Sequence, residues 1–257
     1  MTGEGTVRLE RRGPAAWLVL DRPDARNALT VPMRATAMEL IAAAEADDDV
    51  AAIAVTGAGG HFCAGGDVAS MPAVRDRWDG RERTRTAEAL VSALRDAEKP
   101  TIAVARGAVA GLGVAVFAAC DVRLAAPDAR FRAAFPAIGL IPDGGLLHLL
   151  PRLVGAGRAR DFLLLDEPVD AAVAEAWGLV SRTAPADALD ALAQEIAGTW
   201  AGLPRRALAL TKAGLRLASE ASWEAALEFE RTAQGALIDD AESRARVRAF
   251  LDRGRGA

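Results

Sequence analysis

Short apolar segments separated by turn residues recur along the first half of the chain. Thr6–Glu10 alternates between polar and apolar residues, and Ala16–Leu20 is wholly apolar. The Gly13-Pro14 pair between them is typical of a turn, so the two segments are predicted to form a hairpin. Further strands are predicted at Ala51–Val55, Thr101–Ala105 and Asp121–Ala125, with shorter extended pieces at Arg130–Phe131 and Gly178–Arg182.

Segments with helical spacing alternate with these strands. Thr30 precedes Val31-Pro32 and is expected to cap a helix whose apolar positions recur every three or four residues. Other helices are predicted at Arg81–Glu98, Ala108–Cys120, Leu146–Val154 and Ala159–Leu165, and from Ala186 onward with breaks at Pro204 and near Gly214. Strands that alternate with helices and end in a helical tail predict an α/β fold with a C-terminal helical extension.

Composition and charge exclude several function classes. The 257 residues are 51% hydrophobic and 26% charged, which is enough to bury a full core without a structural metal. A net charge of −4 argues against a nucleic-acid partner, although a local basic pocket remains possible. The two cysteines, Cys63 and Cys120, lack the spacing of a zinc site or a disulfide framework. With neither a signal sequence nor a membrane-length apolar run, we expect a cytoplasmic protein with no membrane partner.

Two glycine-rich segments, Gly57–Asp67 and Arg106–Gly113, each follow a predicted buried strand. Glycine allows a ligand to approach main-chain N–H groups, and an N–H at a helix start carries positive partial charge. Two such junctions side by side could direct two N–H groups at one oxygen atom, as in an oxyanion hole. Ordinary tight turns are the alternative. Neither segment matches a phosphate-binding P-loop or a dinucleotide fingerprint.

These segments resemble those of the crotonase (enoyl-CoA hydratase/isomerase) superfamily. The first match is an N-terminal motif, LDRPDARNAL. The second and third cover the two glycine-rich segments. The remaining two are IGLIPDGG and AWGLV. In this chain the five segments are Leu20–Leu29, His61–Asp67, Gly107–Asp121, Ile138–Gly145 and Ala176–Val180.

The resemblance implies a spiral of ββα turns that binds an acyl-CoA thioester. It implies a homotrimer or a dimer of trimers, with residues 1–195 as the spiral core and residues 196–257 as a helical trimerisation region. No cofactor or metal is implied, because coenzyme A is part of the substrate. By position, the oxyanion N–H groups would belong to Ala64 and Leu112. Substrate contacts would come from Arg26, Gly65, Asp67, Val68, Gly111, Phe135 and Gly144.

The sequence departs from the hydratase pattern at both catalytic glutamates. Those positions fall on Ala115 and Phe135, and neither side chain can transfer a proton. One carboxylate remains well placed, Asp143, at a position where some superfamily members have a catalytic aspartate. Epoxyphenylacetyl-CoA isomerases resemble this stretch most closely. Apolar neighbours would raise the pKa of Asp143 towards neutral pH, as a general base requires.

Alternative roles stay open for several residues. Asp143 could instead cap the following helix, and Asp67 is expected to cap the helix after its own loop. Trp78 and the charged stretch Arg75–Arg85 would form either a lid or a solvated helix. We expect an exposed His61 at a loop tip and a non-catalytic His148. The tail residues Trp223, Leu227 and Phe229 would form an oligomer interface or a pocket wall.

Three functions are consistent with this pattern. The first is an acyl-CoA isomerase, in which Asp143 moves a proton between carbons of the acyl chain. The second is an enoyl-CoA hydratase with non-standard residues. The third is an acyl-CoA-binding homologue without catalysis. A carboxylate beside the thioester favours an enzyme, because a binding protein does not need one.

Overall fold

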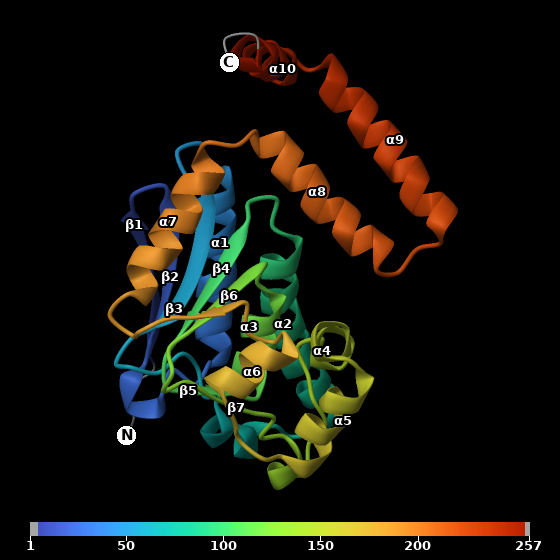
Figure 1. Ribbon diagram of the computed structural model, residues 1–257. Helices are drawn as coiled ribbons and strands as arrows, with labels where there is room; N and C mark the ends of the chain where they lie inside the picture. The colour runs from blue at the N-terminus through green and yellow to red at the C-terminus, as the bar shows by residue number, and fades with distance from the viewer. Residues whose placement is uncertain (1–4, 255–257) are drawn as a thin grey trace.

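A six-stranded sheet forms the centre of the protein in the computed structural model, which describes residues 5–254 (Figure 1). Its strand order is β1-β2-β3-β4-β6-β9. The strands are β1 Thr6–Arg12, β2 Ala15–Asp21, β3 Ala52–Gly57, β4 Thr101–Ala105, β6 Val122–Ala125 and β9 Arg182–Thr183. The β1–β2 pair is antiparallel and every other pairing is parallel. The predicted hairpin and the central strands are therefore confirmed.

Both faces of this sheet are covered, which explains why its central strands are almost wholly apolar. Leu18 and Leu20 of β2 point into the larger core, which also contains apolar residues of α1 Val31–Ala46, α2 Arg77–Asp96 and α3 Leu112–Ala119. Trp17 and Val19 point to the opposite face, which α7 Leu189–Ala201 covers. Successive side chains of a strand alternate between faces, so one apolar segment serves both cores.

A smaller sheet lies below the first and consists of β5 Ala108–Ala110, β7 Arg130–Arg132 and β8 Val169–Asp170. The remaining helices of the core are α4 Leu146–Val154, α5 Ala156–Leu165 and α6 Ala171–Trp177, with short 3-10 turns at Pro23–Ala25, Val68–Ala73 and Pro136–Ile138. Phe117 of α3 connects the smaller sheet to the first glycine-rich segment within the larger core. Its ring packs edge-on against Phe62 and tilted against Phe131 of β7, with centroids 5.7 and 5.1 Å away.

Three helices at the C-terminal end, α8 Arg205–Ala218, α9 Trp223–Asp239 and α10 Ala241–Gly254, extend away from the sheet (Figure 1). Lys212 attaches α8 to the core through an ion pair with Asp121 at 2.7 Å and a hydrogen bond to the Lys99 carbonyl. The predicted division at residues 195 and 196 falls inside α7, which packs on the sheet.

Three predicted elements are corrected. Ala108–Cys120 is not one helix, because Ala108–Ala110 pairs with β7 before α3 begins at Leu112. The late strand is only Arg182–Thr183, since Gly178 ends α6 in a left-handed conformation. α8 continues through Gly214, where the ring of Phe229 packs closely on the helix; the break comes after Ala218. Thr30 does cap α1, because its side chain accepts the Met33 N–H at 3.2 Å.

Candidate active site

A cavity of about 570 Å³ lies between α1, α2, the start of α3 and the segment after β7. This volume is within the range of small-molecule sites. Seven of the predicted site residues line it: Ala64, Gly65, Val68, Gly111, Leu112, Phe135 and Asp143. They come from segments that are far apart in the sequence, so the fold brings most of the predicted site together.

The two glycine-rich segments meet at the wall of this cavity. An isolated parallel bridge pairs Cys63 with Val109, and the Ala110 N–H donates to the Cys63 carbonyl at 2.9 Å. Gly65 fills the remaining gap at a φ of 107°. A Cβ atom there would lie 3.0 Å from the Ala110 oxygen and 3.4 Å from the Leu112 nitrogen. Glycine at this position therefore allows the two segments to approach each other closely.

Gly66 and Leu112 carry the main-chain N–H groups that are available at this junction. The Ala64 N–H instead donates to the Arg26 carbonyl at 2.8 Å, so the prediction that Ala64 supplies an oxyanion donor is wrong for this structure. Both neighbours of Gly66 are hydrogen-bonded to Leu29: the Leu29 N–H donates to the Gly65 carbonyl, and the Asp67 N–H donates to the Leu29 carbonyl. The Gly66 N–H itself has no hydrogen-bond acceptor within residues 5–254. The Leu112 N–H opens α3, where a helix leaves its first donors unused.

Asp143 contributes a half-buried carboxylate with one oxygen atom that the surrounding fold leaves unsatisfied. Its Oδ1 atom is buried and finds no hydrogen-bond partner in the part of the chain that the structure describes. Gly145 occupies the N-cap position of α4, and no side chain caps that helix. The alternative role of Asp143 as a helix cap is therefore excluded, and its carboxylate is left to face the cavity.

The surroundings of Asp143 shift its protonation in the direction expected of a general base. Burial raises the pKa of the Asp143 carboxyl above its ordinary value. The cations Arg34 and Arg83 act against this shift, and the carboxylate of Glu88 adds to it. A raised pKa brings the protonated and ionised forms closer to balance near neutral pH, which suits proton transfer.

The two residues at the positions of the hydratase glutamates lie in apolar surroundings and offer no group for proton transfer. Ala115 is fully buried in α3, and Phe135 is 6% exposed at the cavity wall. Asp143 is the only carboxylate among the lining residues of the described chain. A mechanism that needs two carboxylates to position a water molecule therefore lacks its second group here.

Two arginines line the same cavity and were not predicted from the sequence. Arg34 of α1 is 2% exposed, and Arg83 of α2 is half-buried. A signal for Arg34 did exist, because it precedes Ala37 and Ile41 by three and seven residues and so shares their buried helix face. Gly66 had no comparable signal, since which N–H stays free depends on the pairing of its neighbours with Leu29.

Three predicted substrate contacts lie outside the cavity lining. Arg26 is exposed at the protein surface with a left-handed backbone. Asp67 is buried and accepts a hydrogen bond from Arg22 at 3.0 Å within an ion pair, so its side chain does not cap the following turn as predicted. Gly144 packs beneath Leu112, where an added Cβ would meet the Leu112 side chain at 2.7 Å.

Neither His148 nor Trp78 of the predicted lid lines the cavity, and His61 forms a structural hydrogen bond. His61 is half-buried rather than exposed, because its Nδ1 accepts the Ala108 N–H at 3.1 Å. His148 lies 3.3 Å from Glu220, outside the cavity lining. Trp78 is 63% exposed and does not line the cavity, whereas Gly80 and Thr84 of the same helix do.

The site has the features of one class of enzyme. Free main-chain N–H groups that share a cavity with a half-buried carboxylate are typical of enzymes that stabilise negative charge on a carbonyl oxygen while a proton moves. The chain matches the enoyl-CoA hydratase/isomerase family model over residues 11–256, and it belongs to this family. It is thus an enzyme of the crotonase superfamily, with the corresponding fold.

Individual relatives differ in their activity. The chain is 33% identical to the 1,2-epoxyphenylacetyl-CoA isomerase of Escherichia coli, covering 91% of this chain and 90% of that protein. It is 30% identical to the short-chain-enoyl-CoA hydratase of Clostridium acetobutylicum, covering 96% and 95%. A crystal structure of an enoyl-CoA hydratase from Polaromonas sp. JS666 superposes with a TM-score of 0.93 at 29% identity, over 97% and 98% of the two chains.

No helix within residues 5–254 is long and apolar enough to cross a membrane. In that same range, no group of three or more His, Cys, Asp or Glu side chains is placed to hold a metal ion.

Proposed function

We propose that the protein is an acyl-CoA isomerase in which Asp143 moves a proton between carbon atoms of the acyl chain. The observation that carries this proposal is the half-buried Asp143 carboxylate, whose Oδ1 atom is buried without a hydrogen-bond partner, in a cavity that offers no second carboxylate among its described lining residues. The similarity to the 1,2-epoxyphenylacetyl-CoA isomerase supports it, as does the presence of apolar residues at both hydratase glutamate positions.

The proposed mechanism uses the two N–H groups and the carboxylate together. The thioester oxygen accepts hydrogen bonds from the main-chain N–H groups of Gly66 and Leu112. Ionised Asp143 removes a proton from a carbon of the acyl chain, and the electron pair moves onto that oxygen to form an enolate. Protonated Asp143 then returns the proton to a different carbon, so the atoms balance without a co-reactant. Each oxyanion donor contributes about 3–4 kcal/mol to transition-state stabilisation.

Hydration is the second candidate, and the hydratase of C. acetobutylicum favours it. That reaction adds water to a double bond, so a side chain must position and activate the water molecule. Asp143 would have to perform this step alone. Binding of an acyl-CoA without catalysis is the third alternative, and it would leave the unsatisfied Oδ1 of Asp143 without a role.

Deuterium exchange at C2 of a simple acyl-CoA in heavy water, followed by NMR, tests the proposal. We expect exchange with the wild-type protein and its loss with Asp143→Asn, while the matched control Asp161→Asn, at an exposed position on α5, exchanges normally. Exchange that persists in Asp143→Asn would refute the role of this carboxylate. Tight binding without exchange in the wild type would favour the binding protein, and stoichiometric water addition to an enoyl-CoA would favour the hydratase.

Coenzyme A itself is proposed to lie along the outer part of the cavity. Val68 is 51% exposed at its wall, and Gly65 lies nearby in the first glycine-rich segment. Arg26 is exposed and could pair with a phosphate group, which arginine recognises well. Removal of this charge in Arg26→Gln is expected to weaken the binding of coenzyme A esters and not the exchange rate at saturation.

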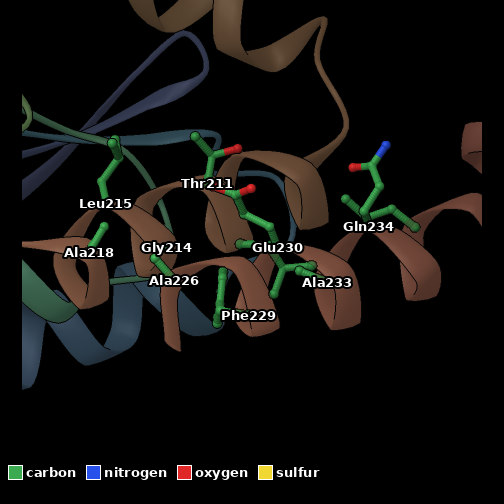
Figure 2. Close-up of a pocket in the computed structure, with 11 residues that line it drawn as sticks. Thr211, Gly214, Leu215, Ala218, Ala226, Phe229, Glu230, Ala233 and Gln234 are labelled. Carbon is green, nitrogen blue, oxygen red and sulfur yellow. The ribbon is translucent and has the colours of Figure 1, made fainter. Parts of the chain in front are cut away.

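The C-terminal helices are proposed to assemble the protein into a homotrimer or a dimer of trimers. A hollow of about 440 Å³ lies between α8 and α9, and Gly214 and Phe229 are among its lining residues. Figure 2 shows the side chains that line it. Large apolar side chains on these helices are strongly exposed in the single chain, among them Leu215, Trp223, Ile238 and Phe250. Exposed apolar surface of this extent is typical of a protein interface. Light scattering on the purified protein gives the mass of the assembly.

A further inference from the structure

Two positive charges on the cavity wall have no partner of opposite charge. No carboxylate oxygen lies within 4.0 Å of Arg34 or Arg83 among the residues that the structure describes. The third arginine of the wall, Arg132, differs because it forms an ion pair with Asp166 at 3.0 Å. The wall therefore holds two cations without an ion-pair partner and one carboxylate, Asp143.

Arg34 is the more unusual of the two arginines. Its guanidinium donates to the Arg83 carbonyl at 3.0 Å, to Thr86 Oγ1 at 3.1 Å and to the Leu29 carbonyl at 3.3 Å. Its Nε atom has no acceptor in the described chain. Burial, and next the nearby Arg83, lower the pKa of Arg34 to about 10, which still leaves it charged at neutral pH. Burying a charge without a counter-ion is costly, so a purely structural arginine would be paired.

Arg83 connects this charge to the glycine-rich segment. Its guanidinium donates to the Asp67 carbonyl at 2.6 Å and to Ser70 Oγ at 2.8 Å. A Cβ atom at Gly66 would lie 2.9 Å from Nη2 of Arg34. Both cations therefore lie directly behind the peptide that carries the free Gly66 N–H.

We propose that Arg34 and Arg83 are positioning residues for the reaction, which act at a distance to keep Asp143 ionised and to stabilise the negative charge that forms on the substrate oxygen. This inference rests on the proposed function of Asp143 as the base. Neither arginine makes an ion pair with Asp143, although all three residues line the same cavity, so the arginines act through their charge and not by contact.

The charges around Asp143 determine whether each substitution raises or lowers the pKa of its carboxyl group. Arg34 on α1 and Arg83 on α2 favour its ionised form, while burial and Glu88 on α2 favour its protonated form. Without the two cations a buried carboxyl would hold its proton at higher pH and could not accept another from the substrate. When the proton moves, the negative charge passes from Asp143 to the enolate oxygen, and the same two cations remain near it throughout.

The test measures C2 exchange against pH for the wild type, Arg34→Gln and Arg34→Lys. Arg34→Gln removes the charge, so the acidic limb of the profile is expected to move up by about one pH unit, the lower end of the range for a nearby opposite charge. Below that limb the rate then falls about tenfold, while KM changes little. Arg34→Lys keeps the charge and should keep the limb in place. Arg85→Gln, an exposed arginine on the same helix as Arg83, is the matched control.

Other outcomes separate this inference from the proposed function. An unshifted limb in Arg34→Gln together with a lower melting temperature would assign Arg34 a structural role only and overturn the inference. If the wild type shows no exchange, the proposed function fails. The further inference can then still be tested by NMR titration of the Asp143 carboxyl, whose signal is identified by its absence in Asp143→Asn. A titration midpoint that does not rise in Arg34→Gln would overturn the inference. If Arg34→Gln does not fold, Arg83→Gln at its half-buried position replaces it under the same criteria.

Discussion

Asp143 is expected to reduce the stability of the folded protein while it supports catalysis. Its Oδ1 atom is buried without a partner, and an unsatisfied buried acceptor costs about 1–3 kcal/mol. Asparagine keeps the shape of the side chain but removes its charge, so Asp143→Asn is expected to stabilise the protein by about 1 kcal/mol at neutral pH. For a chain of this length that corresponds to a melting temperature higher by about 2–4 °C.

The pH dependence of this gain distinguishes the charge from other effects of the substitution. Because burial raises the folded-state pKa of Asp143, the folded protein binds its proton more tightly than the unfolded chain does. The cost of ionisation is therefore absent below about pH 4, the ordinary range for aspartate, and fully present above the folded-state pKa. The melting-temperature difference between Asp143→Asn and the wild type should grow as the pH rises.

Differential scanning calorimetry between pH 4 and pH 8 measures this difference directly. Asp161→Asn, at an exposed position, is the matched control and should show no such trend. A melting temperature of Asp143→Asn that is equal to or below that of the wild type at every pH would refute the reasoning. It would mean that the buried carboxylate finds a hydrogen-bond partner in solution.

Two further substitutions test the packing that supports the site. Gly144→Ala should destabilise the protein by about 1–3 kcal/mol in thermal unfolding, because the new Cβ would meet the Leu112 side chain at 2.7 Å. Gly145→Ala is the control. Gly145 also has a positive φ but nothing within 4 Å of an added Cβ, so this substitution should cost about 1 kcal/mol. Lys212→Met removes the 2.7 Å ion pair with Asp121 that holds α8 to the core. Faster amide hydrogen exchange in α8, with unchanged exchange in the sheet, is the expected result; equal protection in both proteins would contradict it.

Much of the fold could be predicted because its strands are short, apolar and bounded by turn residues. Ala16–Leu20 shows this well, since burial on both faces left no polar position in the segment. The helix over Ala108–Cys120 was wrong because its first three residues are small and apolar, like those of α3, and only their pairing with β7 distinguishes them. The break near Gly214 was wrong because packing against Phe229 outweighs the low helix propensity of glycine.

The candidate site could be predicted only in part. The positions of Leu112 and Asp143 within their motifs correctly predicted that both residues line the cavity. Leu112 directly follows Gly111, and Asp143 lies between Pro142 and Gly144, so both are next to residues that end an element. Spacing could not identify which N–H of the first glycine-rich segment is free. Arg26 lies outside that segment, yet its carbonyl occupies the Ala64 N–H. The charge balance of the cavity was also hidden, because Arg34 and Arg83 belong to helices without a recognised motif.

The residues of the cavity wall come from segments that are far apart in the sequence, and this has a consequence for folding. Arg34, Arg83, Leu112 and Asp143 lie on four segments. The parallel pairs β2–β3 and β3–β4 join strands that α1 and α2 separate in the sequence. Parallel strands pair over long sequence separations, which makes such contacts slow to form. A complete cavity wall therefore requires the whole stretch from Arg34 to Asp143, and a fragment that lacks either end lacks part of the site.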